Sequence, residues 1–277
     1  MLKEYILMSQ YFGILYVLGN LTAIFGIIPG VFNAYTIYAM QGVQPHWTTI
    51  FYIIPSAFIA CSAHGIANAY ALRKYGCIND NGNSGVFNPL KYIDILGFIL
   101  MCLLGYGWTK KQYVNMDRLT KRRKVAVYLS GPIGNLILAV VVLLLQSVLL
   151  TVALVESIQT NPVVDAALFL MNMIIWANLL MCVTHILPIP GFNGYNIIKT
   201  LFFEKSNHKD ADKAKNNGKK ILIAGKVIFA VLAVTGLFLY CAEIPALYAY
   251  NGLAAAQGWL VDLVTGGLYT GSSWIVK

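Results

Sequence analysis

Long apolar runs separated by short polar segments dominate the sequence. Five of these runs are long enough to cross a hydrocarbon layer of about 30 Å as helices, and they lie at residues 11–40, 49–72, 125–154, 164–188 and 221–247. A shorter apolar run at 93–108 is bordered by charged residues. The pattern predicts an all-α polytopic membrane protein with five to six transmembrane helices. A Gly- and Ala-rich stretch near 252–265 contains Asp262 and predicts a further helix that is interfacial or half-inserted.

The composition supports lipid as the solvent of this chain. Of its 277 residues, 58% are hydrophobic and only 11% are charged, and the mean hydropathy is +0.66. A soluble domain carries about 25% charged residues. The five cysteines lie mostly within or beside the apolar runs, where small packing residues are expected, so no disulfide framework is indicated.

The net charge of +9 is distributed unevenly along the chain. Apart from Lys3 and Lys277, every Lys and Arg falls in 73–124 or 199–226, and the segments 41–49 and 155–163 contain none. Cytoplasmic loops are enriched in these residues, so we expect the N-terminus and the basic loops inside and the C-terminus outside. The segment 93–108 must then be re-entrant. Because the basic residues border the spans, they favour membrane lipids as partners and exclude a nucleic-acid role.

Three polar motifs should converge near the predicted cytoplasmic face. They are "SAHGIANAYALRKYG" (62–76), "GPIGN" (131–135) and "HILPIPGFNGYN" (185–196). Each motif alone has an ordinary structural explanation: a helix start for Gly-Pro, an interhelical amide hydrogen bond for Asn135, and a helix stop for Pro-x-Pro-Gly. Their convergence predicts one buried polar site built from three spans.

Taken together, the motifs resemble those of the site-2 protease family of intramembrane zinc metalloproteases, in its small bacterial and archaeal branch. That family has His-Glu-x-x-His, then Gly-Pro-x-x-Asn, then Leu-Pro-x-Pro-x-x-Asp-Gly, and the matching segments here are "HGIAN", "GPIGN" and "LPIPGFNG". The likeness covers residues 50–200 approximately and includes the connecting region 88–115. It implies a three-helix core in which two His and one Asp hold a zinc ion, while a Glu activates the bound water.

The resemblance also suggests the domain organisation. We expect an N-terminal transmembrane helix and outer loop at 1–48 and a site-2-protease-like core at 49–200. A basic cytoplasmic loop follows at 201–220, and a C-terminal transmembrane helix with an interfacial tail occupies 221–277.

When the family's catalytic and zinc-binding residues are matched one by one to this sequence, most of them are absent. Only His64 remains, because Gly65 stands for the Glu, Asn68 for the second His, and Asn193 for the Asp. The family's usual His in the connecting region is Tyr92 here. Loss of a general base typically slows a reaction by about two to four orders of magnitude, and a neutral amide is a poor zinc ligand. The sequence therefore predicts no catalytic residues, no metal and no cofactor, which describes a pseudoprotease.

Two hypotheses concern what has replaced the catalytic metal. In the first, His64, Asn68, Asn135, His185 and Asn193 form a neutral hydrogen-bonded cluster that holds the helices together. In the second, two Cys-x-x-His pairs, Cys61 with His64 and Cys182 with His185, form a closed four-ligand zinc site. Such a closed site would be structural, because it leaves no position for a catalytic water.

Three functional classes are compatible with this layout in a multi-pass protein, for which we expect the plasma membrane of a prokaryote. The first is a regulator, scaffold or subunit that binds a membrane-protein partner or a transmembrane client. The alternative is a divergent but active zinc metalloprotease that cleaves transmembrane or juxtamembrane segments. A transporter is disfavoured, because the sequence shows neither an intramembrane charged pair nor an internal repeat.

Overall fold

The computed structural model describes residues 50–78, 88–105, 107–110, 112, 114, 116–158, 161–203 and 237–267. This part of the chain is helical, and its only β-structure is two isolated bridges. The elements are α3 (Ile50–Lys74), the short 3-10 helix η2 (Pro89–Lys91), α4 (Ile95–Leu104), α5 (Lys121–Val155), α6 (Pro162–Ile186), α7 (Asn193–Ile198), the π-helical turn η3 (Lys199–Phe203) and α9 (Leu237–Thr265).

Three helices in the described part, α3, α5 and α6, are long and apolar enough to cross a membrane. At 1.5 Å per residue, α3 and α6 are each about 37 Å long and α5 is about 52 Å long. They coincide with the predicted spans at 49–72, 125–154 and 164–188, which confirms an all-α membrane protein. The predicted span at 11–40 and most of that at 221–247 lie outside the described residues.

The ends of these helices follow from local sequence signals. The hydroxyl of Thr120 accepts a hydrogen bond from the Arg123 backbone N–H at the start of α5. Asn161 caps α6 in the same way, and Pro162 occupies the first turn, where a backbone N–H has no helical partner. At its other end, α3 finishes on Arg73 and Lys74, whose charges suit the negative end of the helix dipole.

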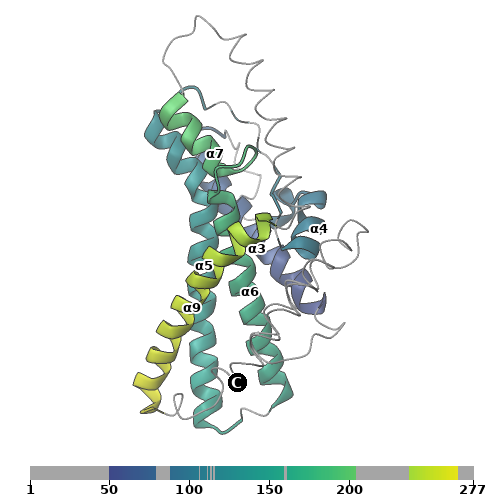
Figure 1. Ribbon diagram of the computed structural model, residues 1–277, viewed down its shortest axis with the longest axis vertical. Helices are drawn as coiled ribbons and strands as arrows, with labels where there is room; N and C mark the ends of the chain where they lie inside the picture. The colour runs from purple at the N-terminus through teal and green to yellow at the C-terminus, as the bar shows by residue number, and fades with distance from the viewer. Residues whose placement is uncertain are drawn as a thin grey trace, which may run out of the picture.

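Helix α6 is the central element of the bundle. It packs against α3, α5 and α9, and α5 packs against α3 and α9. Figure 1 shows α5 and α6 side by side along the long axis of the molecule, with α9 lying across them. The main core cluster joins side chains of these four helices, including Ile53, Leu143, Ile175 and Ala246. This arrangement buries the middle of α6 and, from the three polar motifs, the side chains of His64, Asn135 and His185.

The segment around α4 leaves the bundle and returns to the same place, as the re-entrant prediction requires. The Asp94 side chain caps the helix by accepting from Gly97 N–H, and Gly105 ends it with φ +74°. The two ends then meet, because Ile93 and Thr109 form an antiparallel bridge and Lys110 N–H donates to the Tyr92 carbonyl at 2.8 Å. With a length of about 15 Å, α4 reaches only half-way through a hydrocarbon core.

The C-terminal part differs from the predicted division. A span ending at 247 and a separate interfacial or half-inserted helix at 252–265 were expected. Instead, α9 continues from Leu237 to Thr265 without a break, with Pro245 inside it. The expected division into two helices is therefore wrong. Gly252 and Gly258, which suggested a break, are tolerated because the helix is supported along its length by α5 and α6.

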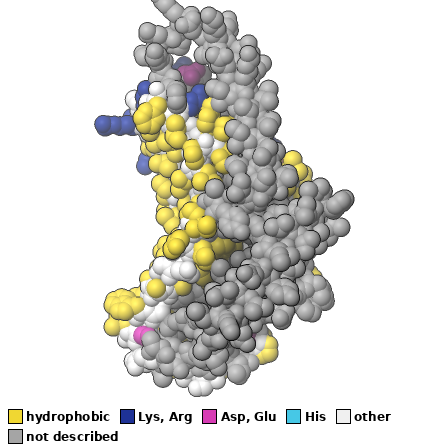
Figure 2. Space-filling model, in the orientation of Figure 1, with side chains coloured by type: hydrophobic (Ala, Val, Ile, Leu, Met, Phe, Trp, Pro, Cys, Tyr) yellow, Lys and Arg dark blue, Asp and Glu magenta, His cyan; other side chains and the backbone are white. Residues whose placement is uncertain are grey.

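One face of α5 presents large apolar side chains to the outside of the bundle. Ile137, Leu144, Leu145 and Val148 are all exposed, while Gly131, Asn135 and Val142 on the opposite face are buried. Figure 2 shows a broad hydrophobic surface below a group of Lys and Arg side chains at one end of the molecule. Such a surface is suited to lipid, and the chain is an integral membrane protein.

Candidate functional site

The "LPIPGFNG" segment turns the chain sharply after α6. Helix α6 ends at Ile186, and Pro188 and Pro190 cannot donate the hydrogen bonds that would continue it. Gly191 then adopts φ +113°, a conformation that side-chain-bearing residues rarely adopt. As a result α7 begins at Asn193 and places this side chain beside His64 of α3.

Two glycines of "GPIGN" allow α5 to approach α3 closely. A Cβ atom on Gly131 would overlap the His64 imidazole, and one on Gly134 would overlap the Cβ of Ala67. Small residues at such crossings let two membrane helices come together closely. The His64 ring therefore lies directly against the backbone of α5, and Asn135, one turn further on, is within reach of that ring.

A chain of amides fixes the protonation of His64. The Ala60 backbone carbonyl can only accept, so the Asn135 amide nitrogen must face it, at 2.9 Å. The same nitrogen donates to Asn178 Oδ1 at 2.9 Å, and Asn178 in turn donates to the Ile174 carbonyl. Asn135 Oδ1 therefore faces His64, whose Nδ1–H donates to it at 2.9 Å. Because the ring is buried and its nitrogens face only uncharged amides, the neutral imidazole with a lone pair on Nε2 is the favoured form.

Asn193 meets this lone pair from α7. Its amide nitrogen lies 3.4 Å from His64 Nε2, a long hydrogen bond. His64, Asn135 and Asn178 are almost fully buried, whereas Asn193 is half-buried. The structure thus joins three of the five residues proposed for a polar cluster, His64, Asn135 and Asn193, and adds Asn178.

His185 and Asn68 lie next to this network without extending it. The centres of the His64 and His185 rings are 4.1 Å apart and the planes are tilted by 46°, so the two rings are in close contact. The His185 Nδ1–H donates to the Met181 carbonyl at 3.0 Å, and the burial of this ring favours its neutral form. Asn68 lines the adjoining cavity, but no hydrogen bond joins it to His64 or Asn193 within the described residues.

A cavity of about 200 Å³ opens beside the two histidines. Its inner wall is neutral and includes His64, Asn68 and Asn193, while Lys110 lies at an exposed position of the same lining. The segment after α4 contributes Gln112, Val114 and Met116 to the lining. The arrangement offers uncharged donors and acceptors, together with room for a peptide side chain.

Tyr92, in the segment before α4, lies very close to Gly65 of α3. A Cβ atom on Gly65 would overlap the Cβ and Cγ atoms of Tyr92. Tyr92 is 7% exposed and packs with Ala69 and Ile66 on the same face of α3. The space next to Gly65 is therefore filled by Tyr92, and a larger side chain has no room there.

A comparison with curated proteins found one similar zinc metalloprotease. Over 155 residues the chain is 28% identical to "Putative zinc metalloprotease YwhC" of Bacillus subtilis (strain 168), covering 54% of this chain and 68% of that protein. This match supports the resemblance to the site-2 protease family. No protein-family model matches the chain. No solved structure matches it either.

The residues present do not fit the family's catalytic zinc ion. Zinc binds imidazole nitrogens at about 2.0–2.1 Å, so two rings on one tetrahedral ion have centres about 5 Å apart. The 4.1 Å between His64 and His185 is too short for this arrangement. Among the described residues, no three His, Cys, Asp or Glu side chains come together as a metal site. The proposed set of Cys61, His64, Cys182 and His185 is therefore not assembled, and Cys61 packs instead with Ala57 and Met101.

Several buried amide side chains of the helices lie outside the three sequence motifs and were not predicted. Asn178 is 0% exposed and anchors the network at His64, although it sits inside an apolar run without any motif around it. A second network joins three helices: Gln146 of α5 donates to Asn172 Oδ1 of α6 at 2.8 Å, and Gln257 of α9 donates to Gln146 Oε1 at 3.0 Å. An amide within a membrane span is itself a signal of an interhelical hydrogen bond, and it could have identified both networks.

Proposed function

We propose that this chain is a catalytically inactive homologue of the site-2 proteases, a pseudoprotease that acts by binding another membrane protein. The contact between Gly65 and Tyr92 carries this proposal. At the position where an active relative needs a carboxylate beside the first histidine, this chain has no side chain, and Tyr92 fills the adjacent space. Restoring the carboxylate would require the segment before α4 to move away.

The cavity supports a binding role as regulator, scaffold or subunit of a membrane complex. The imidazole and amide groups of its inner wall suit an uncharged segment, since a buried charge without a partner would be costly. The occupant proposed is a transmembrane or juxtamembrane segment of a client protein. No metal or other cofactor takes part, and the cluster around His64 is structural.

We further propose the placement of the chain in its membrane. The protein crosses the plasma membrane of a prokaryote several times, with the N-terminus and the basic loops in the cytoplasm and the C-terminus outside. The distribution of Lys and Arg supports this orientation. The basic residues near the spans then contact anionic lipid headgroups.

Reconstitution with a cleavable substrate tests the absence of catalysis. The full chain and its His64→Ala variant are each incorporated into vesicles with a labelled transmembrane peptide and micromolar zinc. We expect no cleavage products above those of protein-free vesicles for either protein. Cleavage by the full chain that His64→Ala abolishes would overturn the proposal.

The name of the Bacillus subtilis relative favours the second candidate, an active zinc metalloprotease. That function would require the contacting rings of His64 and His185 to separate and a third ligand to join them. The same vesicle experiment decides between the two candidates, because only the active enzyme yields fragments that depend on His64 and zinc.

A further inference from the structure

Lys110 is the one Lys or Arg among the described residues that line the cavity at His64, and no Asp or Glu is among them. Its backbone is held in place, because its N–H donates to the Tyr92 carbonyl and the bridge between Ile93 and Thr109 lies beside it. Its side chain is exposed and has no ion pair or hydrogen bond with another described residue. The cavity therefore presents an ammonium group where it opens to the outside.

Positive charge also surrounds this opening. Residues 73–124 contain ten Lys or Arg and only three Asp, so the region has an excess of cations. Leu72, Val114, Met116 and Val127 line the cavity and also pack together where α3 ends and α5 begins. The basic ends of both helices therefore lie next to the cavity, and Figure 2 shows Lys and Arg side chains grouped at one end of the molecule. The electrostatic potential at the opening is positive.

The acids of this region compensate only part of that charge. Asp94 is engaged as the cap of α4, and Asp117 is exposed beside Met116. Neither belongs to the cavity lining. The third, Asp80, lies outside the described residues. A segment that enters the cavity thus meets an ammonium group and, among the described lining residues, no carboxylate.

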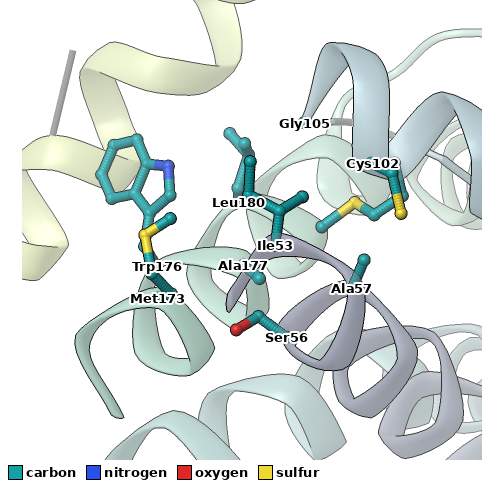
Figure 3. Close-up of a pocket in the computed structure, with 10 residues that line it drawn as sticks. Ile53, Ser56, Ala57, Cys102, Gly105, Met173, Trp176, Ala177 and Leu180 are labelled. Atoms are coloured by element: carbon teal, nitrogen blue, oxygen red, sulfur yellow. The ribbon is translucent and has the colours of Figure 1, made fainter. Parts of the chain in front are cut away.

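Another pocket of the bundle lacks this charge. It lies between α3, α4 and α6, has a volume of about 30 Å³, and is lined by residues such as Ile53, Ala57, Trp176 and Leu180. Figure 3 shows mostly apolar side chains around it. No charged residue belongs to its described lining. Of these two pockets, only the cavity at His64 can distinguish ligands by charge.

We propose that the cavity at His64 selects client segments in which Asp or Glu residues reach Lys110, next to uncharged residues that enter the cavity. The inference rests on the proposed function, which makes this cavity the binding site of a client. Membrane proteins generally carry Lys and Arg on the cytoplasmic side of their spans, the side proposed for the basic loops here. The positive opening repels such segments, because like charges at an interface are unfavourable. The site therefore rejects ordinary cytoplasmic flanks and accepts acidic ones.

Binding of paired peptides in phosphatidylcholine vesicles tests the inference. Each dansyl-labelled probe has a bilayer-spanning Leu-Ala helix and a flexible Gly-Asn-Ser flank, which ends in two Glu in one peptide and two Lys in the other. Energy transfer from the protein's tryptophans to dansyl reports binding. The uncharged lipid prevents competition by anionic headgroups.

The full chain should bind the Glu peptide about two-fold to thirty-fold more tightly at about 0.01 M salt. The range follows from the small contribution of exposed ion pairs, since exchanging Glu for Lys turns attraction into repulsion. At about 1 M salt the preference should shrink, because charges more than about 3 Å apart are then screened.

Two charge-reversal variants locate the preference. Lys110→Glu should bind the Lys peptide more tightly than the full chain does and lose most of the preference for the Glu peptide. Arg122→Glu changes the net charge equally, but Arg122 lies about 140° and about 120° around α5 from the lining residues Val127 and Tyr128. This variant should keep the preference.

Equal binding of the two peptides by the full chain at low salt would overturn the inference and leave the proposed function in place. This comparison does not depend on how well any variant folds. A preference that both variants lower to the same extent would also overturn it, because the general positive surface would then be the cause. Binding of neither peptide would contradict the proposed function and the inference together. Cleavage confined to the Glu peptide would overturn the absence of catalysis and support the charge selection.

Discussion

At the scale of single residues, hydrogen bonds between uncharged groups hold the site around His64 together. Two backbone carbonyls, of Ala60 and Ile174, orient the Asn135 and Asn178 amides, and these in turn fix the tautomer of His64. Each amide is uncharged, so its burial in lipid costs far less than that of a carboxylate without a cation. The network can therefore stabilise the bundle without a metal.

Replacing the amides should lower stability in proportion to the bonds they form. Asn193→Leu removes one long hydrogen bond to His64, and an average bond of this kind in a membrane protein contributes about 0.6 kcal/mol. Asn135→Leu removes three bonds and leaves the His64 Nδ1–H without an acceptor, so we expect a loss of about 2 kcal/mol or more. Thermal unfolding in detergent measures both variants. An unchanged midpoint for Asn193→Leu would show that its contact with His64 has no stabilising role.

A pair of glycine substitutions tests the close contact with Tyr92. Gly65→Ala should destabilise the protein by about 1–3 kcal/mol, because the added methyl overlaps Tyr92 and the cost exceeds the helix preference of Ala. The control is Gly252→Ala in α9, where the added methyl meets no atom within 4 Å. It should stabilise the protein by up to about 1 kcal/mol. If Gly65→Ala behaved like Gly252→Ala in the same denaturation series, the space beside Gly65 would be open.

At the scale of elements, the positions of the helices could be predicted from the sequence. The contacts between them could be predicted only in part. Periods of apolar residues locate α3, α5 and α6, and the Pro-x-Pro-Gly run locates the end of α6. The charge pattern predicted the hairpin around α4, because both flanking segments are basic. The continuity of α9 was missed, since it depends on packing against α5 and α6, which no local signal encodes.

The second amide network should couple α9 to the bundle. Gln257→Leu and Gln146→Leu each remove the hydrogen bond of 3.0 Å between these side chains. In a double-mutant cycle we expect a coupling energy of about 0.6–1.7 kcal/mol, the range measured for such bonds in membranes. Unfolding by a denaturing detergent supplies the four free energies. Strictly additive effects would mean that α9 is held by apolar packing alone.

At the scale of the whole molecule, motifs that resemble those of a zinc metalloprotease meet at one site, where no three described His, Cys, Asp or Glu side chains come together. The motifs predicted which residues would meet, and the structure brings His64, Asn135 and Asn193 together from three distant segments. The sequence could not reveal the close contact of the His64 and His185 rings or the position of Tyr92 against Gly65. Both contacts depend on the distances between packed segments. Glycines allow these close approaches, and only the structure shows which glycines do so.

The zinc content of the purified full chain tests the central claim most directly. After dialysis against buffer with micromolar zinc and removal of free ion, elemental analysis should find less than about a tenth of an equivalent, because two imidazoles in close contact cannot replace the usual three ligands. His64→Ala should leave this value unchanged. Stoichiometric zinc that is lost in the His64→Ala variant would contradict the account and identify a working metal centre.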